Sequence, residues 1–193
     1  MASDNFLPTI TRVTGLLRFI GLLNAAVWLG STAFFTLVTE PALLSADMKH
    51  LLGQNNYPFF AGAITQVVAR RFFVLQIVCA SIALVHMLAA WLYLGKTLRR
   101  LNTSIVAGLF ILALACALLI GPKIEQLHMA KFAKNQPADL ADAAAKSLQL
   151  WLGLGRAVNF IILAGVTVYF VRIASVTGTP SPPRFVPPLK LGI

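Results

Sequence analysis

The chain has 193 residues, of which 58% are hydrophobic and only 11% charged, and its formal net charge is +10. A soluble domain carries roughly 25% charged residues, so this composition excludes an ordinary soluble globule and indicates that lipid covers part of the surface. The basic residues stand between long apolar runs, as membrane orientation favours. No basic run with interleaved aromatic residues is found, so we expect no nucleic-acid binding.

Four apolar runs follow one another along the chain. They cover about residues 19–38, 72–95, 105–121 and 157–171. Each is close to the ~20 residues that a helix needs to cross ~30 Å of hydrocarbon. The sequence therefore predicts an all-α fold: an integral membrane four-helix bundle over residues 1–176, with both termini on the same side.

The helices are expected to extend beyond the bilayer on one side. Pro58 is a good first-turn residue, and nothing from 59 to 71 breaks a helix. Pro137 can likewise open a helix, and residues 138–149 form helix strongly. The third span is expected to continue past a kink at Pro122.

The C-terminal segment 177–193 holds half of the ten prolines and is predicted to be an extended, polyproline-like tail. We expect it to contact other membrane-protein subunits.

Orientation depends on the short loop between the second and third spans. Basic residues divide evenly between the two sides, but short loops weigh most, and this loop contains Lys96, Arg99 and Arg100. The prediction is a bacterial inner membrane with both termini cytoplasmic. Three aromatic residues near span ends suit an interfacial belt, whereas Trp28 is deep enough to pack between helices. The three are Trp91, Tyr93 and Tyr169.

Each span delivers a charged residue to about the same depth at its outer end. Such charges are costly unless paired or hydrated, and Arg–carboxylate pairing would satisfy them. Two interpretations are open: a gate or binding site for an anionic group, or an ion-pair belt that fixes helix register, which is favoured. The residues of this charged ledge are Glu40, Arg70, Arg71, Glu125 and Arg156.

Two cysteines and one histidine lie within the spans. Cys79 is seven residues before His86, on one helical face, and Cys116 is expected at the depth of Cys79 on the antiparallel third span. Thiols with imidazole suit a soft metal such as Cu(I). The alternative is that both cysteines are small buried hydrophobes.

His50 and His128 fall in segments predicted to lie outside the membrane, so a bis-histidine haem is not expected. His86 alone suits a cofactor such as a chlorophyll-type pigment, but a hydrogen bond inside the bundle is the more common role. The sequence predicts no resident cofactor.

The remaining deep polar side chains are Asn24, Gln76 and Asn159, and interhelical hydrogen bonds are expected for them. No Ser/His/Asp set, phosphate-binding loop, zinc motif or carboxylate pair is present. The sequence therefore predicts a protein that is not an enzyme. Small residues mark possible close helix contacts: Gly21, Ala25, Gly30, Ala33, Gly153 and Gly165.

Several short motifs recur at corresponding places in a known membrane family. They are Trp28-Leu29-Gly30, Thr39-Glu40-Pro41-Ala42-Leu43, Arg70-Arg71, Gly121-Pro122-Lys123-Ile124 and Asn159. With these motifs the chain resembles the domain-of-unknown-function family 4149, a four-span membrane family that includes a vertebrate transmembrane protein associated with tolerance of platinum drugs. The resemblance covers roughly residues 16–171 and implies a membrane bundle with no established activity, with some weight on soft-metal handling. Leu152-Gly153 stands where a Leu-His pair is expected, which weakens the metal interpretation. The first span also resembles copper-resistance D-type membrane proteins.

Two functions follow as alternatives. The first is an accessory or structural subunit, non-catalytic, that docks on a larger membrane complex. The second is a small transporter or a soft-metal, copper-handling membrane protein that uses the charged ledge or the Cys79, His86 and Cys116 zone.

Overall fold

The computed structural model describes residues 6–94, 100–133 and 137–177. Every element in these ranges is helical, and two of them are short π-helical turns, labelled η. In chain order the elements are α1 (Phe6–Phe34), η1 (Phe35–Thr39), α2 (Glu40–Leu43), α3 (Ala46–Leu52), α4 (Tyr57–Leu94), α5 (Arg100–Ala115), η2 (Cys116–Ile120), α6 (Gly121–Lys131) and α7 (Ala138–Thr177).

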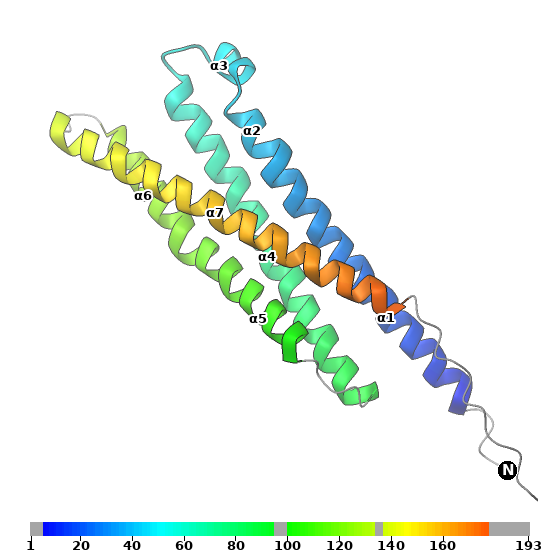
Figure 1. Cartoon of the computed structure of the whole chain (residues 1–193). Helices are drawn as coiled ribbons and strands as arrows, with labels where there is room; N and C mark the ends of the chain where they lie inside the picture. Colours follow the sequence, from blue (N-terminus) through cyan, green and yellow to red (C-terminus); the bar gives the residue numbers. More distant parts are fainter. Residues whose placement is uncertain (1–5, 95–99, 134–136, 178–193) are drawn as a thin grey trace, which may run out of the picture.

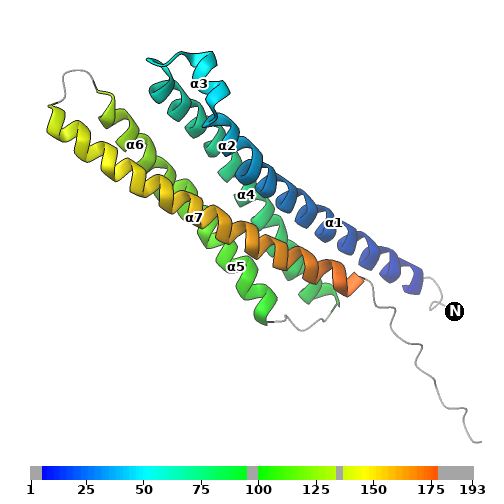
Figure 2. The same cartoon turned by 45° about the horizontal axis from the view of Figure 1, so that its top comes forward.

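These elements form four long rods, because α1–η1–α2 and α5–η2–α6 are each continuous. Figures 1 and 2 show the rods as an elongated bundle in which α1 begins and α7 ends at the same end. Four helical segments are long and apolar enough to cross a membrane: Gly15–Leu43, Tyr57–Leu92, Leu101–Lys131 and Ala138–Ser175. The chain is therefore a multi-pass, all-α integral membrane protein, which confirms the fold class expected from hydropathy.

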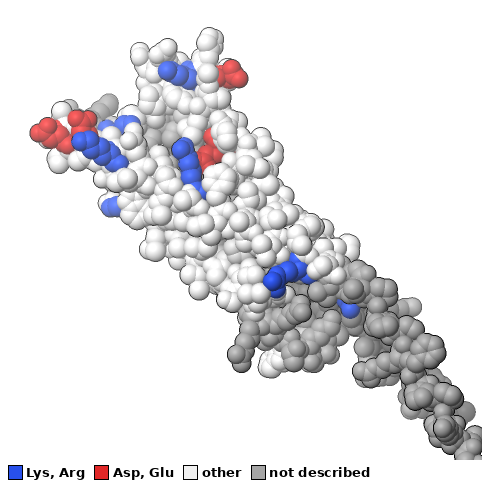
Figure 3. Space-filling view, viewed as in Figure 1, with Lys and Arg blue, Asp and Glu red and all other residues white. Residues whose placement is uncertain are grey.

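The helices are longer than their charge-free segments. Helix α4 starts fifteen residues before the apolar run expected from residue 72, and α7 starts nineteen before residue 157. Arg18 and Glu40 are 22 residues apart along the first rod, a rise of about 33 Å, which matches the ~30 Å hydrocarbon core. Figure 3 shows charged side chains towards the ends of the molecule and a broad uncharged band between them.

The end opposite the termini has two tips, one formed by α3 and the start of α4, the other by α6 and α7 (Figures 1 and 2). The two tips remain in contact, because the Phe59 ring of α4 stacks on the His128 ring of α6. Ser45 caps α3, since its hydroxyl accepts a hydrogen bond from the Met48 N–H at 3.2 Å. The expected Pro-rich tail, beyond Thr177, and most of the loop that contains Lys96 and Arg99 lie outside the described residues.

The two π-helical turns have a common cause in the sequence. In each, the N–H that follows the turn bonds to a carbonyl five residues back: Glu40 to Phe35, and Gly121 to Cys116. The next residue is Pro41 in one rod and Pro122 in the other. Proline has no N–H and its ring clashes with the carbonyl at i−4, so a widened turn accommodates it without breaking the helix.

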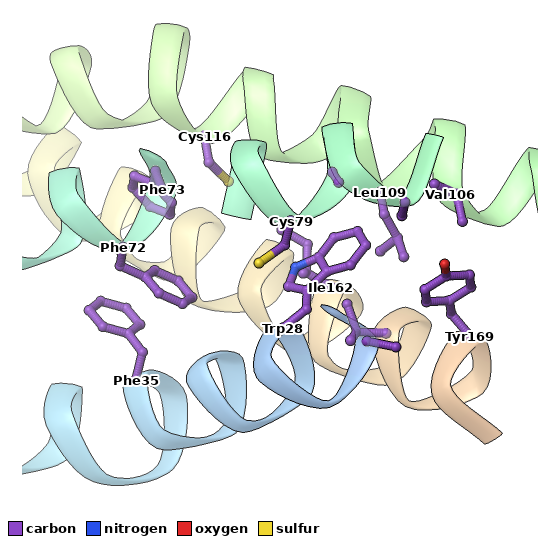
Figure 4. Packing of buried hydrophobic residues seen from close by; sticks show 14 of the residues in the cluster. Trp28, Phe35, Phe72, Phe73, Cys79, Val106, Leu109, Cys116, Ile162 and Tyr169 are labelled. Carbon is purple, nitrogen blue, oxygen red and sulfur yellow. The ribbon is translucent and has the colours of Figure 1, made fainter. Parts of the chain in front are cut away.

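Aromatic side chains fill the centre of the bundle (Figure 4). The Phe35 and Phe72 rings stack with centroids 4.0 Å apart, and Trp28 meets Tyr169 edge-on at 6.2 Å. Trp28 is fully buried, as expected for a side chain between helices. The expectation for Tyr169 was wrong: it is buried in the core and not in an interfacial belt, because the face of α7 that carries it is turned towards α1.

Candidate functional site

The first rod turns a row of polar side chains towards the other helices. Its members are four residues apart, so each lies one turn above the last on nearly the same face. The row begins facing α4 and ends facing α7, because each step of four residues rotates the face by about 40°. Its members are Asn24, Trp28, Thr32, Thr36 and Glu40, of which the first four are buried.

At the outer end of this row Glu40 forms an ion pair with Arg156 of α7. The Arg156 Nε lies 2.6 Å from the Glu40 Oε1, and the Arg156 side chain is 47% exposed against 16% for Glu40. The first and fourth spans therefore meet through two members of the charged ledge.

The other three ledge residues do not join this ion pair. Arg70, Arg71 and Glu125 are exposed on α4 and α6, and within the described ranges no salt bridge includes them. The structure thus supports a single interhelical pair at this level and not a belt around the bundle.

One turn further into the bundle lie Thr36 and Asn159. Thr36 is four residues before Glu40, and Asn159 is three residues after Arg156, so the ion pair places them at the same level on antiparallel helices. Both side chains are buried, and neither the Thr36 Oγ1 nor the Asn159 Oδ1 has a hydrogen-bond partner among the described residues.

Two helical turns further from the ion pair than Thr36, Gln76 of α4 lies at the level of Trp28. This level lies between two contacts of the first rod with α4: Asn24 donates to the Cys79 carbonyl at 2.9 Å on one side, and Phe35 stacks on Phe72 on the other. Gln76 is completely buried. Both atoms of its amide and the Trp28 Nε1 lack a partner in the part of the chain that the structure describes.

Asn24 makes an interhelical hydrogen bond of the kind expected from the sequence. Gln76 makes no such bond among the described residues, although one was expected for it on the same ground, its depth within a span.

At the inner end of the bundle His86 packs against α1. Its ring contacts Gly21 so closely that a Cβ there would lie 2.6 Å from the His86 Cε1. The ring also donates to the Leu17 carbonyl, one turn before Gly21. His86 is therefore a packing and hydrogen-bonding residue of the α1–α4 contact, with its Nδ1 unpaired among the described residues.

His128 repeats this arrangement near the other end of the bundle. Its ring contacts Gly62 of α4 so closely that a Cβ there would clash with the ring, and it donates to the Phe59 carbonyl. It also stacks on the Phe59 ring at 5.5 Å. His128 is buried within the protein, because α6 continues the third span and packs on α4, and its place outside the membrane stays a prediction.

The metal set expected from Cys79, His86 and Cys116 is not assembled. Across the described residues no group of three or more His, Cys, Asp or Glu side chains could hold a metal ion. Both thiols are free and buried within the apolar cluster that Figure 4 shows.

Sequence reasoning missed the row itself, and with it Trp28 Nε1, Thr36 and Thr32 as interior polar groups. The signal was present in the spacing of four between polar or amphipathic residues within an otherwise apolar span. Thr32 differs from Thr36 because its hydroxyl already donates to the Trp28 carbonyl at 2.7 Å.

The geometry defines a class: a four-span membrane protein whose first helix lines an uncharged polar interior under a single ion pair. Residues 23–133, more than half of the chain, match the family described as "Domain of unknown function (DUF4149)", and the protein belongs to that family. The matched segment contains the polar row, Gln76, the partly buried His86 and the buried His128, and ends before α7. No match was found among curated proteins or among solved structures.

Proposed function

We propose that this protein is a non-catalytic accessory subunit that docks within the membrane onto a larger membrane-protein complex. The observation that supports the proposal is a set of exposed apolar side chains at and beyond the Glu40–Arg156 level, towards the tips. Large apolar patches on such a surface are typical of protein interfaces. The set comprises Leu51, Phe60, Val67, Met129, Leu140 and Leu150.

These apolar side chains are highly exposed although they lie outside the uncharged band that faces lipid, and no other described helix covers them. Leu51 in α3 is 79% exposed and Leu150 in α7 is 75% exposed. Both lie on the outer side of Arg156, where the helices have left the segment free of charge. Covering such residues removes apolar surface from water and stabilises the covered state.

The nature of the partner follows from the continuity of this surface. On α4 the exposed apolar residues continue from Val67 to Val74, and on α7 from Leu150 through Leu154 to Ile161. A partner that covers the tips thus also meets the lipid-facing band, which favours another integral membrane protein. The Pro-rich tail after Thr177 is proposed as a second contact with that partner.

The test is the mass of the protein in detergent-free native lipid particles. The chain has a mass of 20.8 kDa, and the proposal predicts particles that contain it together with different, stoichiometric membrane proteins. Leu51→Ser with Leu150→Ser should release the chain, whereas Leu51→Met with Leu150→Met should leave the complex intact because it keeps the apolar surface. Particles that hold a single copy, or only multiples of this chain, would contradict the proposal.

The alternative is a small transporter, and the polar interior is the observation that favours it. Neutral polar side chains lead inward from the partly exposed Glu40–Arg156 pair, as a path for a small solute would require. Reconstituted vesicles would show faster entry of a small neutral solute such as urea than empty vesicles. Entry that is equal in both would exclude this alternative.

A soft-metal role is the weaker form of the alternative, although some resemblance to copper-resistance membrane proteins and to the platinum-tolerance protein points to it. It needs thiol and imidazole ligands around one ion, and the described residues offer no such group. Metal analysis of the purified protein would decide, since stoichiometric copper that Cys79→Ala with Cys116→Ala removes would establish the role.

For localisation we propose a bacterial inner membrane with the termini in the cytoplasm. The short basic loop after α4, which contains Lys96, supports this orientation. Labelling of a cysteine added before Phe6 by a membrane-impermeant reagent in intact cells would contradict it.

A further inference from the structure

Among the described residues eight side chains carry buried polar atoms without a hydrogen-bond partner, and four of the eight, Trp28, Thr36, Gln76 and Asn159, lie close beneath the Glu40–Arg156 pair. Trp28 and Gln76 have no exposed surface, Asn159 is 4% exposed and Thr36 is 5% exposed. The unpaired atoms are Trp28 Nε1, Thr36 Oγ1, Gln76 Nε2, Gln76 Oε1 and Asn159 Oδ1.

Unpaired atoms of this kind are costly. A buried donor or acceptor without a partner costs about 1–3 kcal/mol, and the large majority of buried side-chain polar atoms in proteins have a partner. The surrounding hydrocarbon cannot supply one. Five such atoms in one interior therefore require a partner that enters the bundle.

The four side chains lie along one short stretch of the bundle. Thr36 and Trp28 are eight residues apart on one rod, a rise of about 12 Å. The Glu40–Arg156 pair places Asn159 beside the Thr36 level, and the Asn24–Cys79 and Phe35–Phe72 contacts place Gln76 beside Trp28. The four residues thus lie on the first rod, α4 and α7 within one short stretch of the bundle.

The π-helical turn followed by Pro41 removes one usual donor to the Thr36 carbonyl. In η1 the bonds run from each N–H to the carbonyl five residues back, and Pro41, five residues after Thr36, has no N–H. The Thr36 carbonyl therefore receives no bond from that position.

The chemistry of these atoms selects the partner. The indole N–H only donates, the Asn159 oxygen and the Thr36 carbonyl only accept, and the Gln76 amide and the Thr36 hydroxyl do both. None carries a charge, so an ion would lose its hydration without an opposite charge to replace it. A water molecule both donates and accepts, and buried waters typically make about three hydrogen bonds to groups of this kind.

We propose that Trp28, Thr36, Gln76 and Asn159 form an internal binding site for a short file of water molecules beneath the Glu40–Arg156 pair. The site is independent of the docking function, because it faces the interior and not the tips. If the protein is a transporter, the same atoms define its substrate class as small, uncharged and hydrogen-bonding.

The test observes the Trp28 indole directly. The chain has three tryptophans, and Trp91→Phe with Trp151→Phe leaves Trp28 as the single indole. With the protein uniformly labelled with ¹⁵N and ¹³C in lipid nanodiscs, magnetisation transfer from water to the Trp28 Nε1–H is measured by NMR. The buried backbone amides of Ile162 and Val166 serve as the dry reference. The proposal predicts transfer to the indole several-fold above that reference.

A matched pair of variants on α4 tests whether the water that reaches Trp28 is bound by Gln76. Gln76→Met removes the amide and keeps the side-chain length, so transfer to Trp28 should fall several-fold. Gln66→Met makes the same change on the same helix, ten residues from the site, and should leave transfer unchanged.

Transfer to Trp28 no greater than to the dry reference amides would overturn the proposal. So would a scalar coupling across a direct hydrogen bond from the indole to a protein oxygen. Either result is obtained on the protein with its Gln76 intact, so the test does not depend on the folding of the Gln76 variant.

Discussion

The first and third rods share one backbone design and differ in what they bury. Each is an α-helix that widens into a π-helical turn and then passes through a proline, Pro41 or Pro122. The buried face of the first rod carries Asn24, Thr32 and Thr36. In the α5–η2 part of the third rod the buried residues are apolar, namely Val106, Leu109, Ala113, Cys116 and Ile120, and the α6 part adds the buried His128.

The difference shows that neither the π-helical turn nor the proline requires a polar interior. The third rod packs its apolar face tightly: the side chain of Leu109 lies over Gly165, where a Cβ would come within 2.8 Å. Polar residues on α4 and α7 face the first rod, in the form of Gln76 and Arg156. The unpaired polar atoms beneath the Glu40–Arg156 pair thus come from the first rod, α4 and α7, whereas those of the third rod, His128 Nε2 and Thr103 Oγ1, lie elsewhere.

The largest expected effect comes from Trp28, the centre of the polar row. Trp28→Ala leaves a cavity among α1, α4 and α7 and should lower the free energy of unfolding by about 3–5 kcal/mol. Val106→Ala, on the third rod at the same full burial, removes two methyl groups and should cost about 1–2 kcal/mol. Unfolding in lipid nanodiscs measures both. Equal losses would show that the two rods are packed alike.

The glycines beneath the two histidines come next. Gly62→Ala places a methyl group against the His128 ring and should cost about 1–3 kcal/mol by overpacking. Gly21→Ala should act in the same way through His86. Gly30→Ala is the control on the first rod, since nothing lies within 4 Å of its Cβ position, and it should be neutral or stabilising. A Gly62→Ala protein as stable as the Gly30→Ala protein would refute the close contact.

Substitution of the two buried threonines of the polar row tests whether the interior contains water. Thr36→Val removes a hydroxyl that we expect to bond to water and should cost up to about 1 kcal/mol. A clearly stabilised Thr36→Val protein would mean that the hydroxyl had been buried without a partner. Thr32→Val is the neighbouring control, because the Thr32 hydroxyl bonds to its own helix at the Trp28 carbonyl.

The smallest effect is expected at the Glu40–Arg156 pair. A double-mutant cycle with Glu40→Gln and Arg156→Gln should give a coupling of about 0–1 kcal/mol, because Arg156 is about half exposed. Glu125→Gln removes an exposed carboxylate of the ledge that has no ion pair within the described ranges, and it should show no coupling with Arg156→Gln. If Glu125 coupled to Arg156 as strongly as Glu40 does, the ion pairs would extend around the bundle as a belt.

The four rods could be predicted from local sequence, because the hydropathy and length of each segment depend on that segment alone. It was also enough for the family and for the depth at which Glu40 and Arg156 meet, since counting residues from the span ends sets depth at 1.5 Å per residue. The π-helical turns could have been anticipated only in part, because a kink was expected at Pro122 and none was stated for Pro41.

Rotation of the helices about their axes could not be read from the sequence. It decides that Tyr169 faces Trp28 and not the interface, and that His128 lies on Gly62. It also decides that Cys79, His86 and Cys116 form no common ligand sphere although two of them share a helical face. These outcomes depend on which neighbour each face meets, and that is a property of the whole bundle.

The most direct test of the hydrated interior is an experimental density map of the protein in lipid at a resolution that shows ordered water. The account predicts separate density peaks within hydrogen-bonding distance, about 2.7–3.2 Å, of the Gln76 amide and the Trp28 indole nitrogen. It predicts none along the face of Val106, Leu109 and Ala113. A Gln76 amide bonded directly to protein groups, with no density between α1, α4 and α7, would contradict it.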